Sequence, residues 1–294
     1  MKIAVTIAVL ALIAAPSAGS AQAAFRGRIL DSHVHLNDPA KWVSLMDEAD
    51  IGWAVTFAGR SVGNTGLLEA AAQWPGRFKP FLSVSPEFRE FRTYWERDDT
   101  ALVAIADSLL RQGGFYGIGE ISISHFPSAG FPEADFSPNG RVARGMFALA
   151  RKYGIPVTVH VEITRLRELE AILTEYRDVT VIWAHGGYTP LFLAQRMIDQ
   201  HPNLIYELSA RTWAHHPRSP DYTILRDGVQ VWPEWIALVE RSPERFIVGT
   251  DAAGRSVDSD RSKLNGMASF LGQLTPRAAA LVASANLQRI LRSN

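Results

Sequence analysis

The chain has 294 residues, of which 47% are hydrophobic and 20% are charged, a composition typical of a globular protein. Thirty basic residues balance thirty acidic ones, so no excess of positive charge indicates a nucleic-acid partner. The chain has no cysteine, which excludes disulfides, thiolate metal ligands and a cysteine nucleophile.

The first 23 residues have the pattern of an export signal. Lys2 precedes an apolar run over 3–15, and Ala21-Gln22-Ala23 has the small residues that a signal peptidase recognises. The run is shorter than the roughly 20 residues that a transmembrane helix needs. We therefore expect cleavage after Ala23, a periplasmic or secreted protein, and no stable membrane insertion afterwards. An uncleaved membrane anchor is the alternative.

The remainder, 24–294, alternates between short apolar runs and amphipathic segments. The runs predict strands at 27–36, 52–58, 78–85, 115–123, 155–163, 179–186, 203–210 and 245–252. The segments between most of them predict helices, for example over 99–112 and 164–176. Thr189-Pro190 and Thr275-Pro276 each place a capping hydroxyl before a first-turn proline. Eight such units in about 250 residues predict an α/β protein with one domain, a (β/α)8 TIM barrel.

Five of the predicted strands end in side chains that a buried core does not accept without partners. These side chains are His33, His35, Glu120, His160, His185 and Asp251. In a barrel, the carboxyl ends of the strands meet at the face that carries the active site. Imidazole and carboxylate ligands without thiolate suit zinc, manganese or iron. The sequence therefore predicts a divalent metal at the barrel mouth, with zinc as the expected ion.

Alternative interpretations exist for two of these motifs. His33 and His35 are separated by one residue, so on a strand both point the same way and can reach one ion. They could instead donate to loop carbonyls. Glu120 could form a salt bridge at the rim or orient a histidine rather than bind metal.

The motifs, taken in order, resemble those of the amidohydrolase superfamily, and the resemblance covers nearly all of 24–294. Asp31-Ser-His33-Val-His35 is similar to the signature on the first strand of that superfamily. His160 and His185 are similar to its histidines on strands 5 and 6, and Asp251 to its aspartate on strand 8. The segment 285–291 is similar to the ending of many amidohydrolase-related proteins.

The resemblance implies a metal-dependent hydrolase with one or two ions. Glu120 stands where other members carry a carboxylated lysine, as in the TatD-like branch, where a glutamate bridges two ions. With two ions, the implied ligands are His33, His35 and Asp251 for the first and His160 and His185 for the second, with Glu120 between them. With one ion, His33, His35, His160 and Asp251 form its shell.

The implied reaction is the attack of a metal-activated water on a small carbonyl substrate, such as a lactone, ester or amide. Asp251 would shuttle the proton, and His185 would polarise the substrate oxygen as an electrophile. Hydrolysis of a phosphoester or phosphotriester and metal-dependent decarboxylation are alternatives at the same site. A barrel that binds metal or ligand without turnover is a third interpretation.

Residues beyond the strand ends are candidates for contact with a small-molecule substrate. Glu162 lies two positions beyond His160 in the fifth predicted strand, His125 follows the fourth, and Arg211 and Trp213 follow the seventh. The same side chains could instead pack the loops onto the barrel rim. His215 and His216 are not expected to be metal ligands, because adjacent side chains diverge. The oligomeric state, with a homo-oligomer as one option, is left open.

Overall fold

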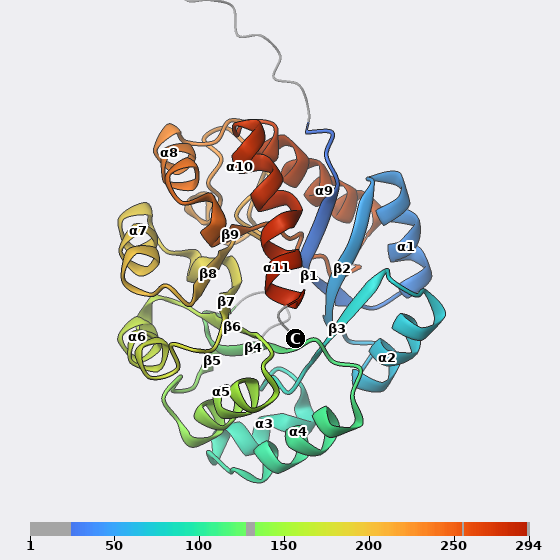
Figure 1. The fold of residues 1–294 in the computed structure, drawn as a ribbon, viewed down its shortest axis with the longest axis vertical. Helices are drawn as coiled ribbons and strands as arrows, with labels where there is room; N and C mark the ends of the chain where they lie inside the picture. The colour runs from blue at the N-terminus through green and yellow to red at the C-terminus, as the bar shows by residue number, and fades with distance from the viewer. Residues whose placement is uncertain (1–24, 128–132, 255, 293–294) are drawn as a thin grey trace, which may run out of the picture.

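The computed structural model describes residues 25–127, 133–254 and 256–292, which form a ring of parallel strands surrounded by helices (Figure 1). The predicted single-domain (β/α)8 barrel is confirmed, because eight strands follow one another around the ring in chain order. Their bounds are β1 Ile29–Leu36, β2 Ile51–Ala58, β3 Phe78–Leu82, β4 Gly117–His125, β6 Val157–Val161, β7 Val181–Trp183, β8 Leu204–Glu207 and β9 Phe246–Ile247. A two-residue strand, β5 Ala134–Asp135, pairs antiparallel with the end of β4.

The expected export segment 1–23 lies outside the described residues. Among the residues that are described, no helix combines the length and the apolar character needed to cross a membrane.

Most of the helices form an outer layer around the strands (Figure 1). The α-helices are α1 Pro39–Glu48, α2 Asn64–Gln73, α3 Arg89–Glu96, α4 Ala101–Gln112, α5 Arg141–Tyr153, α6 Leu166–Glu175, α7 Leu191–Gln200, α8 Pro233–Arg241, α9 Val257–Leu271, α10 Pro276–Ala280 and α11 Asn286–Arg292. Short 3₁₀ turns are η1 Ile163–Arg165, η2 Ala184–Tyr188, η3 Pro220–Tyr222 and η4 Pro243–Arg245, and η5 Leu281–Ala285 is a π-helical turn.

The two predicted helix caps have different outcomes. Thr275 caps α10 as predicted, since its hydroxyl accepts the N–H of Ala278 at 3.4 Å. The corresponding prediction for Thr189 at α7 is wrong, because its hydroxyl donates instead to the carbonyl of Gly186 at 2.7 Å. The tight turn before α7 brings that carbonyl within reach and leaves Pro190 as the capping residue.

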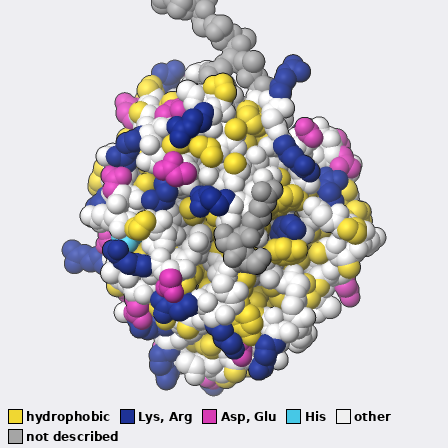
Figure 2. All heavy atoms as spheres, viewed as in Figure 1, with side chains coloured by type: hydrophobic (Ala, Val, Ile, Leu, Met, Phe, Trp, Pro, Cys, Tyr) yellow, Lys and Arg dark blue, Asp and Glu magenta, His cyan; other side chains and the backbone are white. Residues whose placement is uncertain are grey.

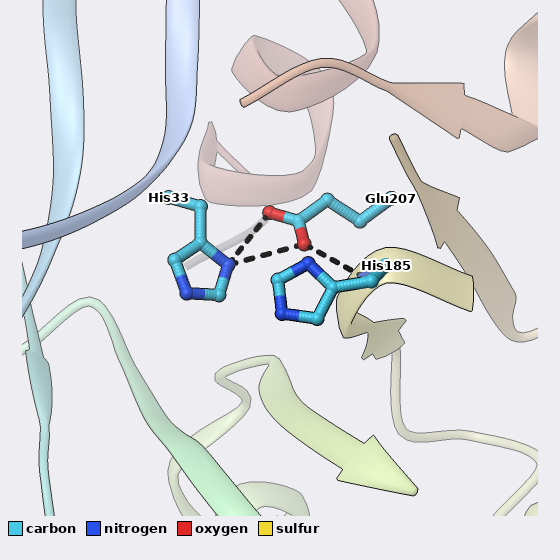
Figure 3. Close-up of side chains that lie close together, drawn as sticks. All are labelled: His33, His185 and Glu207. Carbon is cyan, nitrogen blue, oxygen red and sulfur yellow. Dashed lines mark hydrogen bonds and ion pairs between the residues drawn. The ribbon is translucent and has the colours of Figure 1, made fainter. Parts of the chain in front are cut away.

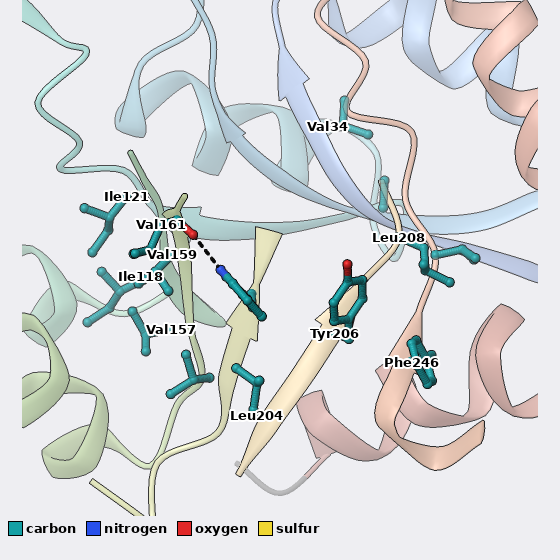
Figure 4. Packing of buried hydrophobic residues seen from close by; sticks show 14 of the residues in the cluster. Val34, Ile118, Ile121, Val157, Val159, Val161, Leu204, Tyr206, Leu208 and Phe246 are labelled. Carbon is teal, nitrogen blue, oxygen red and sulfur yellow. Dashed lines mark hydrogen bonds between the residues drawn. The ribbon is translucent and has the colours of Figure 1, made fainter. Parts of the chain in front are cut away.

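The strands alternate between an apolar outer face and an inner face that becomes polar towards the mouth. On β6, Val157, Val159 and Val161 belong to the large core between strands and helices (Figure 4). Successive side chains of a strand point to opposite faces, so Thr158 and His160 point into the barrel. This alternation delivers polar side chains to the mouth without interrupting the outer core.

A second, smaller core fills the barrel interior. Its members are Leu30, Val55, Phe57, Phe81, Ile182, Ile205 and Ile247 from the strands, with Leu287, Ile290 and Leu291 from α11. Helix α11 crosses the centre of the ring and closes one end of the barrel (Figure 1). On the face around it, basic and acidic side chains are interspersed rather than separated by sign (Figure 2).

The barrel closes between its last and first strands. The Ser32 N–H donates to the Val248 carbonyl at 3.0 Å, and the His35 N–H donates to the Ala252 carbonyl at 2.8 Å. The buried Asp31 carboxylate strengthens the closure, because it accepts the Thr250 hydroxyl at 2.6 Å and the Thr250 N–H at 2.9 Å. Closure therefore fixes β1 against the segment after β9.

Candidate metal centre

Four side chains from three separate parts of the chain meet at the carboxyl ends of the strands. His33 and His35 come from β1, Glu120 from β4 and Asp251 from the segment after β9. Their donor atoms are His33 Nε2, His35 Nε2, Glu120 Oε2 and Asp251 Oδ1. The two imidazole nitrogens lie 3.2 Å apart, and each lies 3.2 Å from Glu120 Oε2. Asp251 Oδ1 lies 3.7 Å from His33 Nε2 and 3.6 Å from His35 Nε2.

These separations fit a divalent cation held by His33, His35 and Glu120, with Asp251 beside the two imidazoles. Ligands at 2.0–2.2 Å from a tetrahedral ion lie about 3.3–3.6 Å from one another, close to the 3.2 Å among the first three donor atoms and to the 3.6 and 3.7 Å from Asp251 Oδ1 to the two imidazole nitrogens. Hydrogen bonds alone do not account for the cluster, because several acceptors converge on the same two nitrogen atoms. The side chains of His35 and Asp251 are 20% and 19% exposed, so the position is open to the barrel mouth.

A second group of donors surrounds the other oxygen of Glu120. Its Oε1 atom lies 3.2 Å from His160 Nδ1 and 3.5 Å from His185 Nε2. The three side chains are close enough to hold an ion of their own. Glu162 holds the remaining nitrogen of His160, with Oε1 at 3.1 Å from Nε2. Glu120 thus faces both groups, one oxygen to each.

The buried carboxylates Glu120 and Glu207 favour positive charge on the neighbouring imidazoles. Burial lowers the pKa of His33, but Glu207 and Glu120 outweigh burial and hold this pKa well above its ordinary value. Burial raises the pKa of Asp251, but the charges of His185 and His33 and of other nearby cationic groups bring it below its ordinary value. The aspartate is therefore ionised at neutral pH and available as a ligand or proton acceptor.

Glu207 at the end of β8 belongs to the site but is not among the donors predicted from the sequence. It is fully buried, and both of its oxygens lie 3.1 Å from Nδ1 of His33 (Figure 3). The backbone N–H of His185 donates to Glu207 Oε2 at 3.3 Å. The available signal was an acidic residue inside the apolar run predicted as the seventh strand.

The backbone around His185 forms an unusual left-handed turn. His185, Gly186 and Gly187 have φ values of 56°, 53° and 55°. A Cβ atom on Gly186 would lie 1.8 Å from Cζ of Tyr206, so only glycine fits. Asp251 also has a positive φ, of 50°. Such conformations are costly for residues with a side chain and cluster at functional sites.

Aromatic rings stack above the second group of donors. Tyr188 lies parallel to His185, with ring centroids 5.1 Å apart, and parallel to Tyr222, at 4.3 Å. His216 lies 3.3 Å from the Tyr188 hydroxyl and stacks on Trp213 at 5.2 Å. Tyr188 of η2 and the side chains of Trp213, His216 and Tyr222 from the loop after β8 therefore form an aromatic wall beside the donors.

The side chains predicted to contact substrate lie in different surroundings. Glu162 pairs with Arg218 Nη1 at 2.9 Å as well as with His160. His125 lies at the end of β4, with its ring centroid 5.6 Å from that of His160. Trp213 stacks on His216, as described above. These three candidates border the mouth.

Arg211 has a different environment. Its side chain is 1% exposed, packs over the Trp235 ring of α8 at 5.0 Å and donates to the Thr189 carbonyl at 3.0 Å. This placement assigns Arg211 to the packing between the barrel and α8 and gives no support to a contact with substrate.

A (β/α)8 barrel with imidazoles and carboxylates gathered at its mouth defines the class of metal-dependent hydrolases and lyases. Residues 38–294 match the profile of the family described as Amidohydrolase, Amidohydro_2. The chain belongs to this family, whose members typically bind a divalent metal and act on small molecules. The matched segment begins after His33 and His35.

Solved structures share the fold at low sequence identity. An uncharacterised TIM-barrel protein from Bordetella bronchiseptica is 16% identical with a TM-score of 0.64, over 90% of this chain and 99% of that one. A probable 2-pyrone-4,6-dicarboxylic acid hydrolase from Acinetobacter baumannii is 14% identical with a TM-score of 0.55, over 90% and 99%. A 2,6-dihydroxybenzoate decarboxylase from Rhizobium is 12% identical with a TM-score of 0.58, over 90% and 98%. No curated protein matches the sequence.

Proposed function

We propose that the chain is a metal-dependent hydrolase that acts on a small carbonyl substrate, namely a lactone, ester or amide. The observation that carries the proposal is the convergence of donor atoms from His33, His35 and Glu120, which lie 3.2 Å from one another, with Asp251 Oδ1 at 3.6 and 3.7 Å from the two imidazole nitrogens. Zinc is the ion that we propose, because the donors are nitrogen and oxygen atoms at tetrahedral spacing.

A second ion would lie between Glu120 Oε1, His160 Nδ1 and His185 Nε2. In this arrangement Glu120 would offer one oxygen to each ion, as the resemblance to the TatD-like branch implies. A bound divalent cation lowers the pKa of a water molecule from 15.7 to about 7 and polarises a carbonyl oxygen.

The residues of the chain supply proton transfer and orientation. Asp251 is the proton acceptor, because it is ionised at neutral pH and its side chain reaches the open mouth. With two ions, His185 would hold the second ion through Nε2, and that ion would polarise the substrate oxygen. If one ion binds, His160 would join the shell of the first ion, and His185 would act as the electrophile with a hydrogen on Nε2.

The substrate lies against the aromatic wall in this proposal. Trp213 and His125 offer ring surfaces, and Glu162 presents a carboxylate that Arg218 holds in place. Such surroundings suit a compact organic molecule with a planar part. Decarboxylation at the same site is the competing reaction, and the experiment below separates the two.

We also propose that the protein is exported and cleaved after Ala23, on the sequence pattern of 1–23 alone. The N-terminal sequence of the mature protein from the periplasmic fraction tests this proposal. A mature chain that starts at Met1 would contradict it.

The proposed activity is tested with zinc-loaded and chelator-treated protein on panels of lactones, aryl esters, N-acyl amides and phosphotriesters. We expect metal-dependent turnover in one of the first three classes and none with Asp251→Asn. Carbon dioxide release from aromatic carboxylic acids, without hydrolysis of any ester or amide, would replace the proposal by decarboxylation. Turnover confined to phosphotriesters would also overturn it.

A further inference from the structure

We propose that Glu207 is a positioning residue that sets the tautomer and orientation of His33 and, together with Ser209, of His185. The inference deepens the proposed function, because it concerns the two imidazoles that would face the metal. It rests on the hydrogen bonds that Glu207 and Ser209 form with these two histidines.

The Glu207 carboxylate accepts hydrogen bonds from four groups: two serine hydroxyls, one imidazole and one backbone N–H. The Ser32 hydroxyl donates to Oε1 at 2.7 Å, and the Ser209 hydroxyl donates to Oε2 at 2.6 Å. His33 Nδ1 lies 3.1 Å from both oxygens, and the His185 backbone N–H reaches Oε2 at 3.3 Å. A carboxylate has about four lone-pair positions, so these donors saturate it.

This saturation argues against Glu207 as a metal ligand itself. Glu207, His33 and His185 lie close enough together to hold an ion (Figure 3). However, both carboxylate oxygens already accept hydroxyl groups at short distances, and no lone pair remains for a cation. Glu207 therefore orients the two imidazole residues through hydrogen bonds and does not bind the ion alongside them.

The contacts of His33 determine which of its nitrogens carries the proton in the neutral ring. Nδ1 faces the Glu207 carboxylate, which can only accept a hydrogen bond. Nδ1 therefore carries the hydrogen, and the lone pair lies on Nε2. That nitrogen is the one that faces His35 and Glu120, so the carboxylate directs the lone pair of His33 towards the proposed ion.

Ser209, two residues after Glu207, fixes the tautomer of His185 in the same way. His185 Nδ1 lies 3.0 Å from the carbonyl oxygen of Ser209, which is also only an acceptor. Its hydrogen is therefore on Nδ1, and its lone pair on Nε2 faces Glu120 Oε1 at 3.5 Å. The Ser209 hydroxyl, 2.8 Å from the same Nδ1, donates to Glu207. One segment, 207–209, thus orients an imidazole of each proposed metal position.

The test compares Glu207→Gln with Ser32→Ala as the matched control. The substitution Glu207→Gln replaces an accepting oxygen by an amide group that donates, whereas Ser32→Ala removes a donor of Glu207 that touches no imidazole in the contacts described. Each protein, freed of metal, is titrated with Co²⁺, and its visible spectrum is recorded. We expect the apparent Co²⁺ affinity to fall 10–100-fold in Glu207→Gln, with a changed spectrum, and about twofold or less in Ser32→Ala.

A second readout does not depend on metal. In proteins with ¹⁵N-labelled histidine, we expect a protected Nδ1–H resonance of His33 in the wild type and in Ser32→Ala. This resonance should be lost or strongly shifted in Glu207→Gln, and it is assigned by its absence from His33→Gln. If Glu207→Gln does not fold, Glu207→Asp takes its place: the shorter side chain keeps the charge but withdraws the carboxylate from His33 Nδ1, so we expect a smaller loss of affinity in the same direction and a shift of the His33 resonance, and an unchanged affinity and resonance would overturn the proposal.

Unchanged Co²⁺ affinity, spectrum and imidazole resonances in Glu207→Gln would overturn the proposal. A wild-type protein that takes up no Co²⁺, but whose His33 Nδ1–H resonance depends on Glu207, would instead remove the proposed metal function and leave the positioning role intact. Equal losses of affinity in Ser32→Ala and Glu207→Gln would assign the effect to general damage of β1 and β8 and would also overturn the proposal.

Discussion

The backbone N–H of Asp251 donates to the carbonyl of His33 at 2.9 Å. This bond joins the segment after β9 to β1, and it places the Asp251 carboxylate 3.7 Å from Nε2 of His33. A residue proposed as proton acceptor is thus held by the backbone of a residue proposed as ligand. The side chain can then be changed without removing this bond.

For this reason Asp251→Asn should retain its fold and at least part of its metal but lose turnover. We expect the rate to fall by at least about 10²-fold, because the amide does not accept the proton. Metal content by elemental analysis and steady-state rates measure the two effects. Asp258→Asn on α9, where the side chain is 97% exposed, is the matched control. Unchanged turnover in Asp251→Asn would remove the assigned role.

Glu120→Gln should lower the metal content from about two ions per chain to about one. The two carboxylate oxygens face different donor groups, and the amide presents only one oxygen to them. Elemental analysis after equilibration with zinc measures the stoichiometry. The surface variant Glu96→Gln should behave as the wild type. Equal stoichiometry in Glu120→Gln and the wild type would show that Glu120 does not bridge.

Gly186→Ala should destabilise the protein more than Gly76→Ala. Both glycines have positive φ, 53° and 80°, so each substitution costs about 1–2 kcal/mol in backbone conformation. A Cβ atom on Gly76 meets nothing within 4 Å, whereas one on Gly186 meets the buried Tyr206 ring, which adds about 1–3 kcal/mol. Urea unfolding measures the difference. Equal losses would indicate that Tyr206 moves aside freely.

His216 should make the metal-free protein sensitive to acid. Burial, together with the charge of His185, lowers the pKa of His216 from 6.5 to about 4. The unfolded chain therefore takes up this proton first, and the stability that the neutral ring provides is complete above pH 6.5 and is lost as the pH falls towards 4.

The corresponding variant is His216→Gln, whose side chain does not titrate. Between pH 7 and pH 4.5, the wild type should lose about 2–3 kcal/mol more of its free energy of unfolding than the variant does. Urea unfolding of both metal-free proteins at several pH values measures this difference. Parallel losses in the two proteins would show that His216 titrates normally in the folded state.

The strand and helix pattern of the sequence was sufficient to predict the barrel. Apolar runs mark all eight parallel strands, because both faces of each strand are buried. Six of the eight predicted strands are longer than the observed ones, for example 203–210 against Leu204–Glu207. Some of the extra residues lie in the turns that follow the strands, such as His185 and Gly186 in the left-handed turn after β7.

The donors at the mouth could also be predicted, since strand ends in a barrel share one face. Glu207 could not be separated from its apolar run without knowing which residues point inward. The contacts of Arg211 with Trp235 and the Thr189 carbonyl could not be inferred from its position after the seventh predicted strand. The Tyr188 ring depends on the left-handed turn through Gly186 and Gly187. Such local reversals leave little trace in residue type.

The contact between Asp31 and Thr250 joins positions 219 residues apart, at the seam where the ring of strands closes. His33 and Asp251 face each other only across this seam. A partly folded chain with an open ring therefore lacks the aspartate beside the two imidazoles of β1. In the proposed function, an ion held by His33, His35 and Asp251 would connect the two edges of the ring, so its binding would favour the closed barrel over the open one.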